Sequence, residues 1–213
     1  MADTRRMLAF DLETGGLDPT KTDLLTGYFA ILDSDFKVLE ELSLKLKPEG
    51  RLPIVEAKAM STNGIDLQKH LEDPNTITYA EGGKRLTALV KKYLKKNGRY
   101  SNIIPMGYNI DSFDVPWAQH HLIDKDTWGS MIHYKCLDVS HDVDVLKRHG
   151  WLPPTCGTLS SMVEHFGVPK GEAHVAKDDI IMTVGVFLKL KELMESKKNG
   201  GSSQDLISLL ESE

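Results

Sequence analysis

Asp11 and Glu13 form the first of three short segments whose residue types could carry out metal-assisted chemistry. They stand two residues apart after an apolar run, and on a β-strand that spacing points both carboxylates to the same side. Two carboxylates held so close repel each other unless a cation lies between them. Taken alone, the pair is equally consistent with a solvated strand end.

Asp114, His174 and Asp179 occupy the other two segments. Asp114 opens a predicted helix, where the helix dipole favours an anion. Asp179 follows His174 by five residues at the start of the last long helix, so the two side chains can share one rim of a site. An imidazole, whose unperturbed pKa is about 6.5, suits a general base at neutral pH. Taken singly, Asp114 is more consistent with a helix-start residue and His174 with a structural or exposed histidine.

Apolar and alternating stretches predict the strands that position these residues. Residues 7–12 form a strand that ends in the first acidic pair, and residues 24–32 and 38–46 form a hairpin beside it. Later strands are expected at residues 102–106 and 131–137. The predicted helices are residues 54–60, 67–71, 80–94, 113–123, 159–166 and 180–194. Three early strands followed by strand–helix units predict an α/β fold with a mixed sheet and helices packed on it.

The size and composition of the chain indicate one globular domain. Its 213 residues are 40% hydrophobic and 27% charged, which allows a sizeable core. From residue 196 the composition changes to Lys, Asn, Gly and Ser, which predicts a flexible linker, followed by a short segment with four apolar residues. We therefore expect a domain over residues 1–195 and a linker with a short C-terminal segment over residues 196–213.

The net charge of −5 and the two cysteines limit the partners and compartments that fit this chain. The charge gives the fold no general affinity for nucleic acid, so any nucleic acid must be held locally. Cys136 and Cys156 form no CxxC pair, which argues against a zinc site or a disulfide framework. The sequence contains no signal-peptide core and no run of about 18 apolar residues. We expect a soluble cytoplasmic protein that binds no membrane.

The three acidic segments together resemble the ExoI, ExoII and ExoIII motifs of the DEDDh (DnaQ-like) 3′–5′ exonucleases in content, order and spacing. Residues 10–19, 166–168 and 171–176 also resemble the sequences around the first and third motifs of that family. The histidine five residues before Asp179 is similar to the histidine branch rather than the tyrosine branch. The resemblance spans about residues 5–190 and implies a ribonuclease H-like fold with a five-stranded mixed sheet.

The resemblance also implies a role for each of the five residues. Asp11, Glu13 and Asp179 would surround a first divalent cation. Asp11 would bridge to a second cation, which Asp114 would support through water, and His174 would take the proton from the attacking water. Oxygen ligands suit Mg²⁺ or Mn²⁺ rather than zinc. Two such ions, about 3.5–4 Å apart, supply the nucleophile and the charge stabilisation that phosphodiester hydrolysis needs.

Six further residues are implied to bind the terminal nucleotide: Thr14, Gly15, Leu17, Asn63, Asn109 and Phe113. The first three would edge the pocket, and the others would line it by hydrogen bonding or by stacking on base or sugar. Leu17 and Phe113 are also consistent with core residues. Gly15 and Asn63 depart from the residues common in the family, which affects substrate contacts rather than the chemistry. The spacing of Asn109 and Phe113 resembles the exonuclease domains of DNA polymerases and favours DNA.

We therefore predict a two-metal 3′–5′ exonuclease that releases nucleoside 5′-monophosphates from single-stranded or frayed DNA ends. Two alternatives stay open. An exoribonuclease of the same fold would differ only in a 2′-hydroxyl contact, and a non-catalytic nucleic-acid-binding module would not need the five intact catalytic positions. Residues 205–213 could dock on a polymerase or another protein partner, or form a disordered end.

Overall fold

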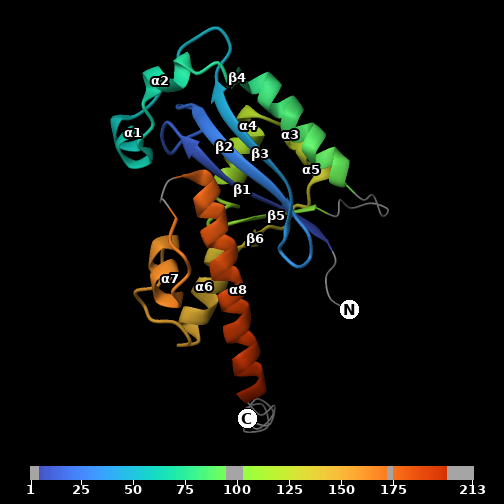
Figure 1. Ribbon diagram of the computed structural model, residues 1–213, viewed down its shortest axis with the longest axis vertical. Coiled ribbons are helices and arrows are strands. Elements are labelled where there is room, and N and C mark those ends of the chain that lie inside the picture. The colour runs from blue at the N-terminus through green and yellow to red at the C-terminus, as the bar shows by residue number, and fades with distance from the viewer. Residues whose placement is uncertain (1–4, 95–102, 172–174, 201–213) are drawn as a thin grey trace, which may run out of the picture.

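The fold is an α/β arrangement built on one mixed sheet (Figure 1). The computed structural model describes residues 5–94, 103–171 and 175–200. Strand β1 (Arg6–Thr14) pairs with antiparallel β2 (Leu24–Leu32) on one side and with parallel β5 (Ile103–Gly107) on the other. The strand order is β4-β3-β2-β1-β5-β6, in which the remaining strands are β3 (Val38–Lys47), β4 (Thr76–Thr78) and β6 (Leu137–Asp138). The apolar β1 is thus an interior strand, as its composition predicts.

The sheet has six strands rather than the five predicted. The additional strand, β4, has only three residues, two of them threonines, so it shows no apolar stretch in the sequence. The strand predicted at residues 131–137 is displaced, because Met131 ends helix α5 (Lys125–Met131) and only Leu137–Asp138 form β6. Ile132 contributes one isolated bridge to Ile103. The α/β class and the mixed sheet are confirmed.

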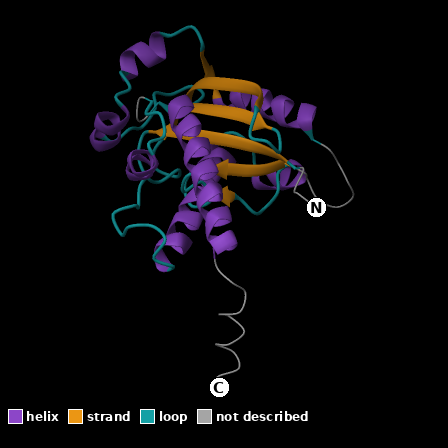
Figure 2. Cartoon of the chain, turned by 60° about the horizontal axis from the view of Figure 1, so that its bottom comes forward, coloured by secondary structure: helices purple, strands orange, loops and turns teal. Residues whose placement is uncertain are grey.

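Helices cover both faces of the sheet, which Figure 2 shows from a second direction. One core lies between the sheet and α3 (Tyr79–Tyr93), α4 (Asp114–His121) and α5. The other core lies between the sheet and α6 (Val139–Arg148), α7 (Leu159–Phe166) and α8 (Ala176–Gly200). Two short helices, α1 (Ala57–Asn63) and α2 (Leu67–Glu72), lie between β3 and β4 in the chain.

The alternation of side chains along β1 decides which face of the sheet carries the acids. Leu8, Phe10 and Leu12 belong to the core under α3, α4 and α5, whereas Met7 and Ala9 belong to the core under α6, α7 and α8. Because side chains alternate along a strand with a period of two, Asp11 and Glu13 share the face of Met7 and Ala9. The strand therefore presents both carboxylates on the α8 side.

Helix α8 is longer than the sequence predicts. It was expected over residues 180–194, but it begins at Ala176 and ends at Gly200, so the first five residues of the predicted linker are helical. The remaining residues of the predicted tail, 201–213, lie outside the described part of the chain. Cys136 and Cys156 are both free cysteines. Within the described residues, no helix is long and apolar enough to span a membrane.

Candidate active site

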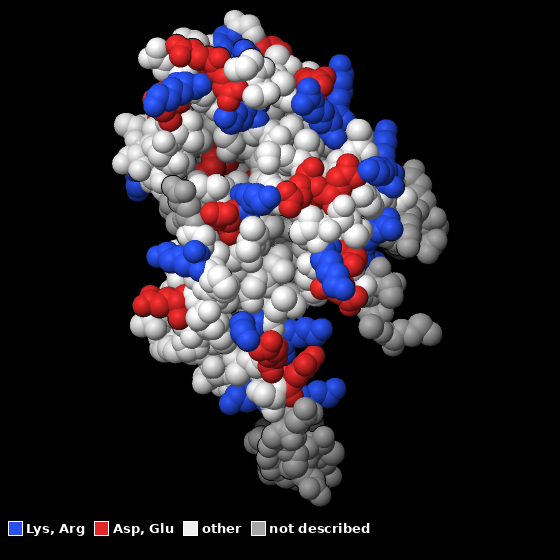
Figure 3. All heavy atoms as spheres, in the orientation of Figure 1, with Lys and Arg blue, Asp and Glu red and all other residues white. Residues whose placement is uncertain are grey.

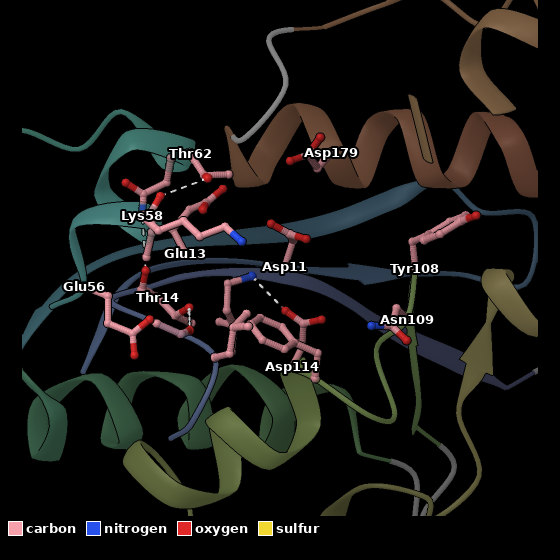
Figure 4. A pocket seen from close by; sticks show the side chains of 16 residues that line it. Asp11, Glu13, Thr14, Glu56, Lys58, Thr62, Tyr108, Asn109, Asp114 and Asp179 are labelled. Carbon is pink, nitrogen blue, oxygen red and sulfur yellow. Dashed lines mark hydrogen bonds between the residues drawn. The ribbon is translucent and has the colours of Figure 1, made fainter. Parts of the chain in front are cut away.

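Three carboxylates meet at the carboxyl end of β1, two from the strand and one from α8 (Figure 4). Asp179 is placed in the first turn of α8, where its amide donates to the Val175 carbonyl at 3.0 Å. Carboxylate oxygens of Asp11, Glu13 and Asp179 lie within 4.8 Å of one another. The fold therefore joins the first and third acidic segments, which are far apart in the sequence.

Asp114 approaches the three carboxylates from the other face of the sheet, where α3, α4 and α5 pack. It is the first residue of α4 and is only 4% exposed. Its Oδ1 accepts a hydrogen bond from the Leu12 amide at 3.0 Å. Leu12 is the residue between Asp11 and Glu13 in β1. This bond fixes the start of α4 against the end of β1, so the position of the fourth carboxylate depends on the packing of the core.

The acidic cluster is electrostatically unfavourable without a counter-charge. Burial raises the pKa of Asp11 well above its usual range, and the charges of Asp114, Glu13 and Asp179 raise it further. Burial, followed by the charge of Asp179, raises the pKa of Glu13 to about 8. Burial also raises the pKa of Asp114, although the hydrogen bond from Leu12 opposes that effect. Groups that repel one another in this way are typical of sites that bind cations.

The donor set of the cluster fits a divalent metal ion. All of its ligand atoms are carboxylate oxygens, which hard cations such as Mg²⁺ and Mn²⁺ prefer. Asp11, Glu13 and Asp179 are close enough to one another to share one ion. Asp114 lines the same pocket and adds a fourth carboxylate to it.

A pocket of about 330 Å³ opens over the acids. Five of the six residues predicted to bind the terminal nucleotide line it, namely Thr14, Leu17, Asn63, Asn109 and Phe113. Leu17 is 78% exposed and is therefore a surface residue at the pocket rather than a core residue. Phe113 lines the pocket and also packs against the core under α4.

Among the described residues of the predicted site, Gly15 does not line the pocket. Gly15 is replaced there by Gly16. The Gly15 amide donates to the Asp23 carbonyl at 2.7 Å, and a Cβ at position 15 would lie 2.7 Å from the Ile54 carbonyl oxygen. Gly15 is thus needed for the close approach of two backbone segments. His174 lies outside the described residues, so its role as a general base stays a prediction.

The loop before Asp114 is held by a residue that the sequence analysis did not identify. Asn109 adopts a left-handed conformation with φ 61°, which is uncommon for a residue other than glycine. Oδ1 of the buried Asp138 accepts hydrogen bonds from the Asn109 amide at 2.8 Å and from the Ser140 amide at 3.0 Å, and Oδ2 accepts one from the Asp111 amide at 3.3 Å. Although burial acts to raise the pKa of Asp138, hydrogen bonds from Ser140, Asp111 and Asn109 lower it.

Asp138 also belongs to a second group of potential ligands, with Asp111 and His141. Its Oδ1 already accepts two backbone amides and the Ser140 hydroxyl, so few of its lone pairs are free for a cation. We interpret this group as the cap of α6 and a support for the Asn109 loop. An acid that follows a predicted strand and precedes Ser140 carries a cap signal in the sequence, but α6 was not predicted.

Helix α1 contributes lining residues that were also not identified from the sequence. These are Lys58, Ala59 and Thr62, with Glu56 just before the helix. The sequence predicts a helical piece at residues 54–60, but nothing in its composition indicates which face meets the acids. That face is set by a tertiary contact of α1 with the end of β1, between segments more than forty residues apart in the sequence.

The comparisons with known proteins agree on the fold. No protein-family model and no curated protein matches the sequence. The zinc-bound form of Escherichia coli exonuclease I with single-stranded DNA matches with a TM-score of 0.68 and 19% identity, over 97% of this chain and 45% of that one. Exonuclease I from Methylocaldum szegediense matches with a TM-score of 0.68 and 19% identity, over 98% of this chain and 46% of that one.

A complex of exonuclease I with an SSB-Ct partner matches with a TM-score of 0.66 and 19% identity, over 97% of this chain and 46% of that one. This chain thus spans just under half the length of the solved structures that it matches. Its fold is the ribonuclease H-like α/β fold of these exonucleases, with a mixed six-stranded sheet flanked by helices.

Proposed function

We propose that this protein is a metal-dependent 3′–5′ exonuclease of the DEDDh family that acts on single-stranded or frayed DNA. The observation that carries the proposal is the meeting of Asp11, Glu13 and Asp179 within 4.8 Å of one another beneath a pocket that Asp114 also lines. The likeness to exonuclease I, which binds single-stranded DNA in one of the matching structures, supports DNA over RNA as the substrate.

The four carboxylates would hold two divalent cations, Mg²⁺ or Mn²⁺. Asp11, Glu13 and Asp179 would hold the first, and Asp11 and Asp114 would hold the second. When bound, such ions lower the pKa of water and offset the charge that develops on the phosphate. Because the raised pKa values of Asp11, Glu13 and Asp114 arise from burial and mutual repulsion, cations bound among them convert a strained acidic cluster into a stable one.

The remaining site residues orient the substrate and move its protons. His174 takes the proton from the attacking water, which requires a neutral imidazole at the working pH. Leu17 contacts the terminal base or sugar, and Phe113 and Asn109 line the same pocket. Hydrolysis then releases a nucleoside 5′-monophosphate and leaves a new 3′-hydroxyl end.

Residues 1–195 form the catalytic domain in this proposal, with helix α8 continuing beyond it. The segment at residues 205–213 docks on a protein partner, such as a polymerase. A partner is bound by exonuclease I in the complex with SSB-Ct, which makes protein binding a property worth testing in this chain as well.

The decisive experiment follows the shortening of matched 5′-labelled DNA and RNA oligonucleotides in Mg²⁺ and in EDTA. We expect the DNA ladder to shorten from the 3′ end, EDTA to stop it, and His174→Ala to slow it by ~10²–10⁴-fold. His165→Ala, at an exposed histidine on α7, is the matched control and should keep full activity. Faster loss of RNA would identify the exoribonuclease alternative. Cleavage of neither polymer would indicate the non-catalytic module.

A further inference from the structure

Lys58 is the single basic residue among the described residues that line the pocket, where five residues are acidic. Its side chain extends from α1 toward Asp11 in Figure 4. Within the described part of the chain, the Lys58 ammonium forms no ion pair, even though the acidic cluster lies in front of it. A lysine that faces several carboxylates without pairing is available to a ligand that enters the same space.

The position of Lys58 does not come from the packing of the core. Helix α1 has no buried residue. Hydrogen bonds hold it at both ends instead. The Glu56 amide donates to the Gly15 carbonyl at 2.6 Å, and Nδ2 of Asn63 donates to the Thr14 carbonyl at 3.1 Å. Both tethers end in the segment that directly follows Glu13, so α1 is attached to the acidic site itself.

Only one side of this short helix faces the acids. Lys58, Ala59 and Thr62 line the pocket, and residues four apart on a helix lie on the same face. The Thr62 hydroxyl donates to the Lys58 carbonyl at 3.0 Å, so it is occupied within the helix. The lysine ammonium is therefore the charged group that α1 directs toward the pocket.

The charge balance of the site indicates what Lys58 binds. Asp11, Glu13, Asp114 and Asp179, when ionised, carry four negative charges, which two divalent cations would cancel. Glu56 and Lys58 add one charge of each sign, so a phosphodiester that enters the site brings one further negative charge. Lysine binds phosphate as a compact point charge with three donors. We propose that Lys58 binds a non-bridging oxygen of the phosphate that is cleaved, an inference that rests on the function proposed above.

Three variants test this assignment by kcat/KM on a 5′-labelled oligothymidylate in Mg²⁺. Lys58→Ala should lower kcat/KM about 10- to 100-fold, the range expected when one hydrogen bond to a charged group is lost. Lys58→Arg keeps the charge and should recover most of the activity. Lys69→Ala is the matched control, because Lys69 is an exposed lysine on the neighbouring helix α2 and does not line the pocket.

The salt dependence of kcat/KM distinguishes a phosphate contact from a structural effect. Loss of one contact to a single strand should reduce the slope of log kcat/KM against log salt by about 0.7. The melting temperature should not change, because α1 buries no residue. Equal values for Lys58→Ala and Lys69→Ala would overturn the role of Lys58 alone. A wild-type protein that cleaves no oligonucleotide would overturn the exonuclease function, and the Lys58 proposal with it.

Discussion

The end of β1 and the helix α1 line the same pocket, but they are held in place by different interactions. Asp11 lies in a strand paired on both sides, and its neighbours Phe10 and Leu12 are buried in the core. Lys58 lies on a helix without a buried residue, tethered by hydrogen bonds at its two ends. The acidic side of the pocket, at the end of β1, is therefore as stable as the core, whereas the α1 side can open locally.

This difference separates two kinds of defect. A change among the carboxylates should affect chemistry and stability together, since burial and repulsion act on those groups in the folded protein. A change in α1 should affect substrate binding and leave the melting temperature nearly unchanged. The mixed distribution of acidic and basic side chains on the face shown in Figure 3 agrees with local rather than general binding of nucleic acid.

The largest effect is expected for Asp11→Asn. Activity should fall below a few per cent, because the substitution removes the carboxylate shared by both proposed cations. In EDTA the same variant should melt at least about 2 °C above the wild type, since it replaces a charge that three other carboxylates repel. Turnover in Mg²⁺ and thermal unfolding in EDTA measure the two effects. A fully active or a less stable variant would break the comparison.

A substitution at Asp138 tests whether β6 positions the Asn109 loop at the pocket. Asp138→Ala removes the acceptor of the Asn109, Asp111 and Ser140 amides, and the cap of α6 with it. We expect a loss of about 2–3 kcal/mol in unfolding free energy, since three part-buried backbone amides lose a charged acceptor and α6 loses its cap. The variant should also raise KM about tenfold by releasing the left-handed Asn109.

Denaturant unfolding and steady-state kinetics below the melting temperature measure these two changes. Asp142→Ala, at the next acid along α6, provides a control. Among the described residues, Asp142 forms no hydrogen bond with the Asn109 loop. If Asp138→Ala keeps the wild-type KM, then the loop holds Asn109 without help from β6.

The sequence was sufficient to predict the parts of the site that depend on local pattern. The apolar run before Asp11 predicted an interior strand, and the two-residue spacing predicted that Glu13 shares its face; both are seen in the structure. Asp114 and Asp179 were placed at helix starts, which the structure also shows. These features follow from periodicity and capping, which are properties of neighbouring residues.

The features that the sequence did not predict depend on contacts between distant segments. The face of α1 that carries Lys58 is defined by hydrogen bonds to the Gly15 loop, and the role of Asp138 is defined by amides almost thirty residues earlier. Helix α5 was missed because its short segment has few apolar residues, and strand β4 because three residues give no period. Residue types alone do not encode these relations.

We expect the fold to lose stability in acid because of His121, a half-buried histidine on α4. His121, at the end of α4, stacks on Trp117 with ring centroids 5.2 Å apart, and burial, followed by the charge of His120, lowers its pKa to about 4. Its unfolded pKa is about 6.5, so the unfolded state binds the proton first and stability is lost as the pH falls from about 6.5 toward 4. His121→Phe should recover about 2 kcal/mol of that loss at pH 4.5.

Urea unfolding at pH 7 and at pH 4.5 measures this effect. The matched control is His165→Phe, which makes the same exchange at an exposed histidine on α7 and should leave the acid loss unchanged. The quantity to compare is the change in unfolding free energy of each protein between pH 7 and pH 4.5, rather than its stability at one pH. An identical acid loss in wild type and His121→Phe would place the sensitive group elsewhere.

The smallest effect is expected for Asn63→Ala, which removes one of the two hydrogen bonds that hold α1 at the end of β1. Asn63→Ala removes the hydrogen bond to the Thr14 carbonyl and the acceptor of the Ile65 amide, but no buried group. The melting temperature should stay within about 1 °C of the wild type, because Asn63 is only half-buried and no residue of α1 is buried. KM should rise about threefold while kcat is retained, because α1 then holds Lys58 over the pocket for only part of the time. Thr62→Ala, which leaves both tethers intact, should keep the wild-type KM. A fall in kcat with unchanged KM would mean that α1 acts on the carboxylates rather than on the substrate, and the two sides of the pocket could no longer be treated as separate.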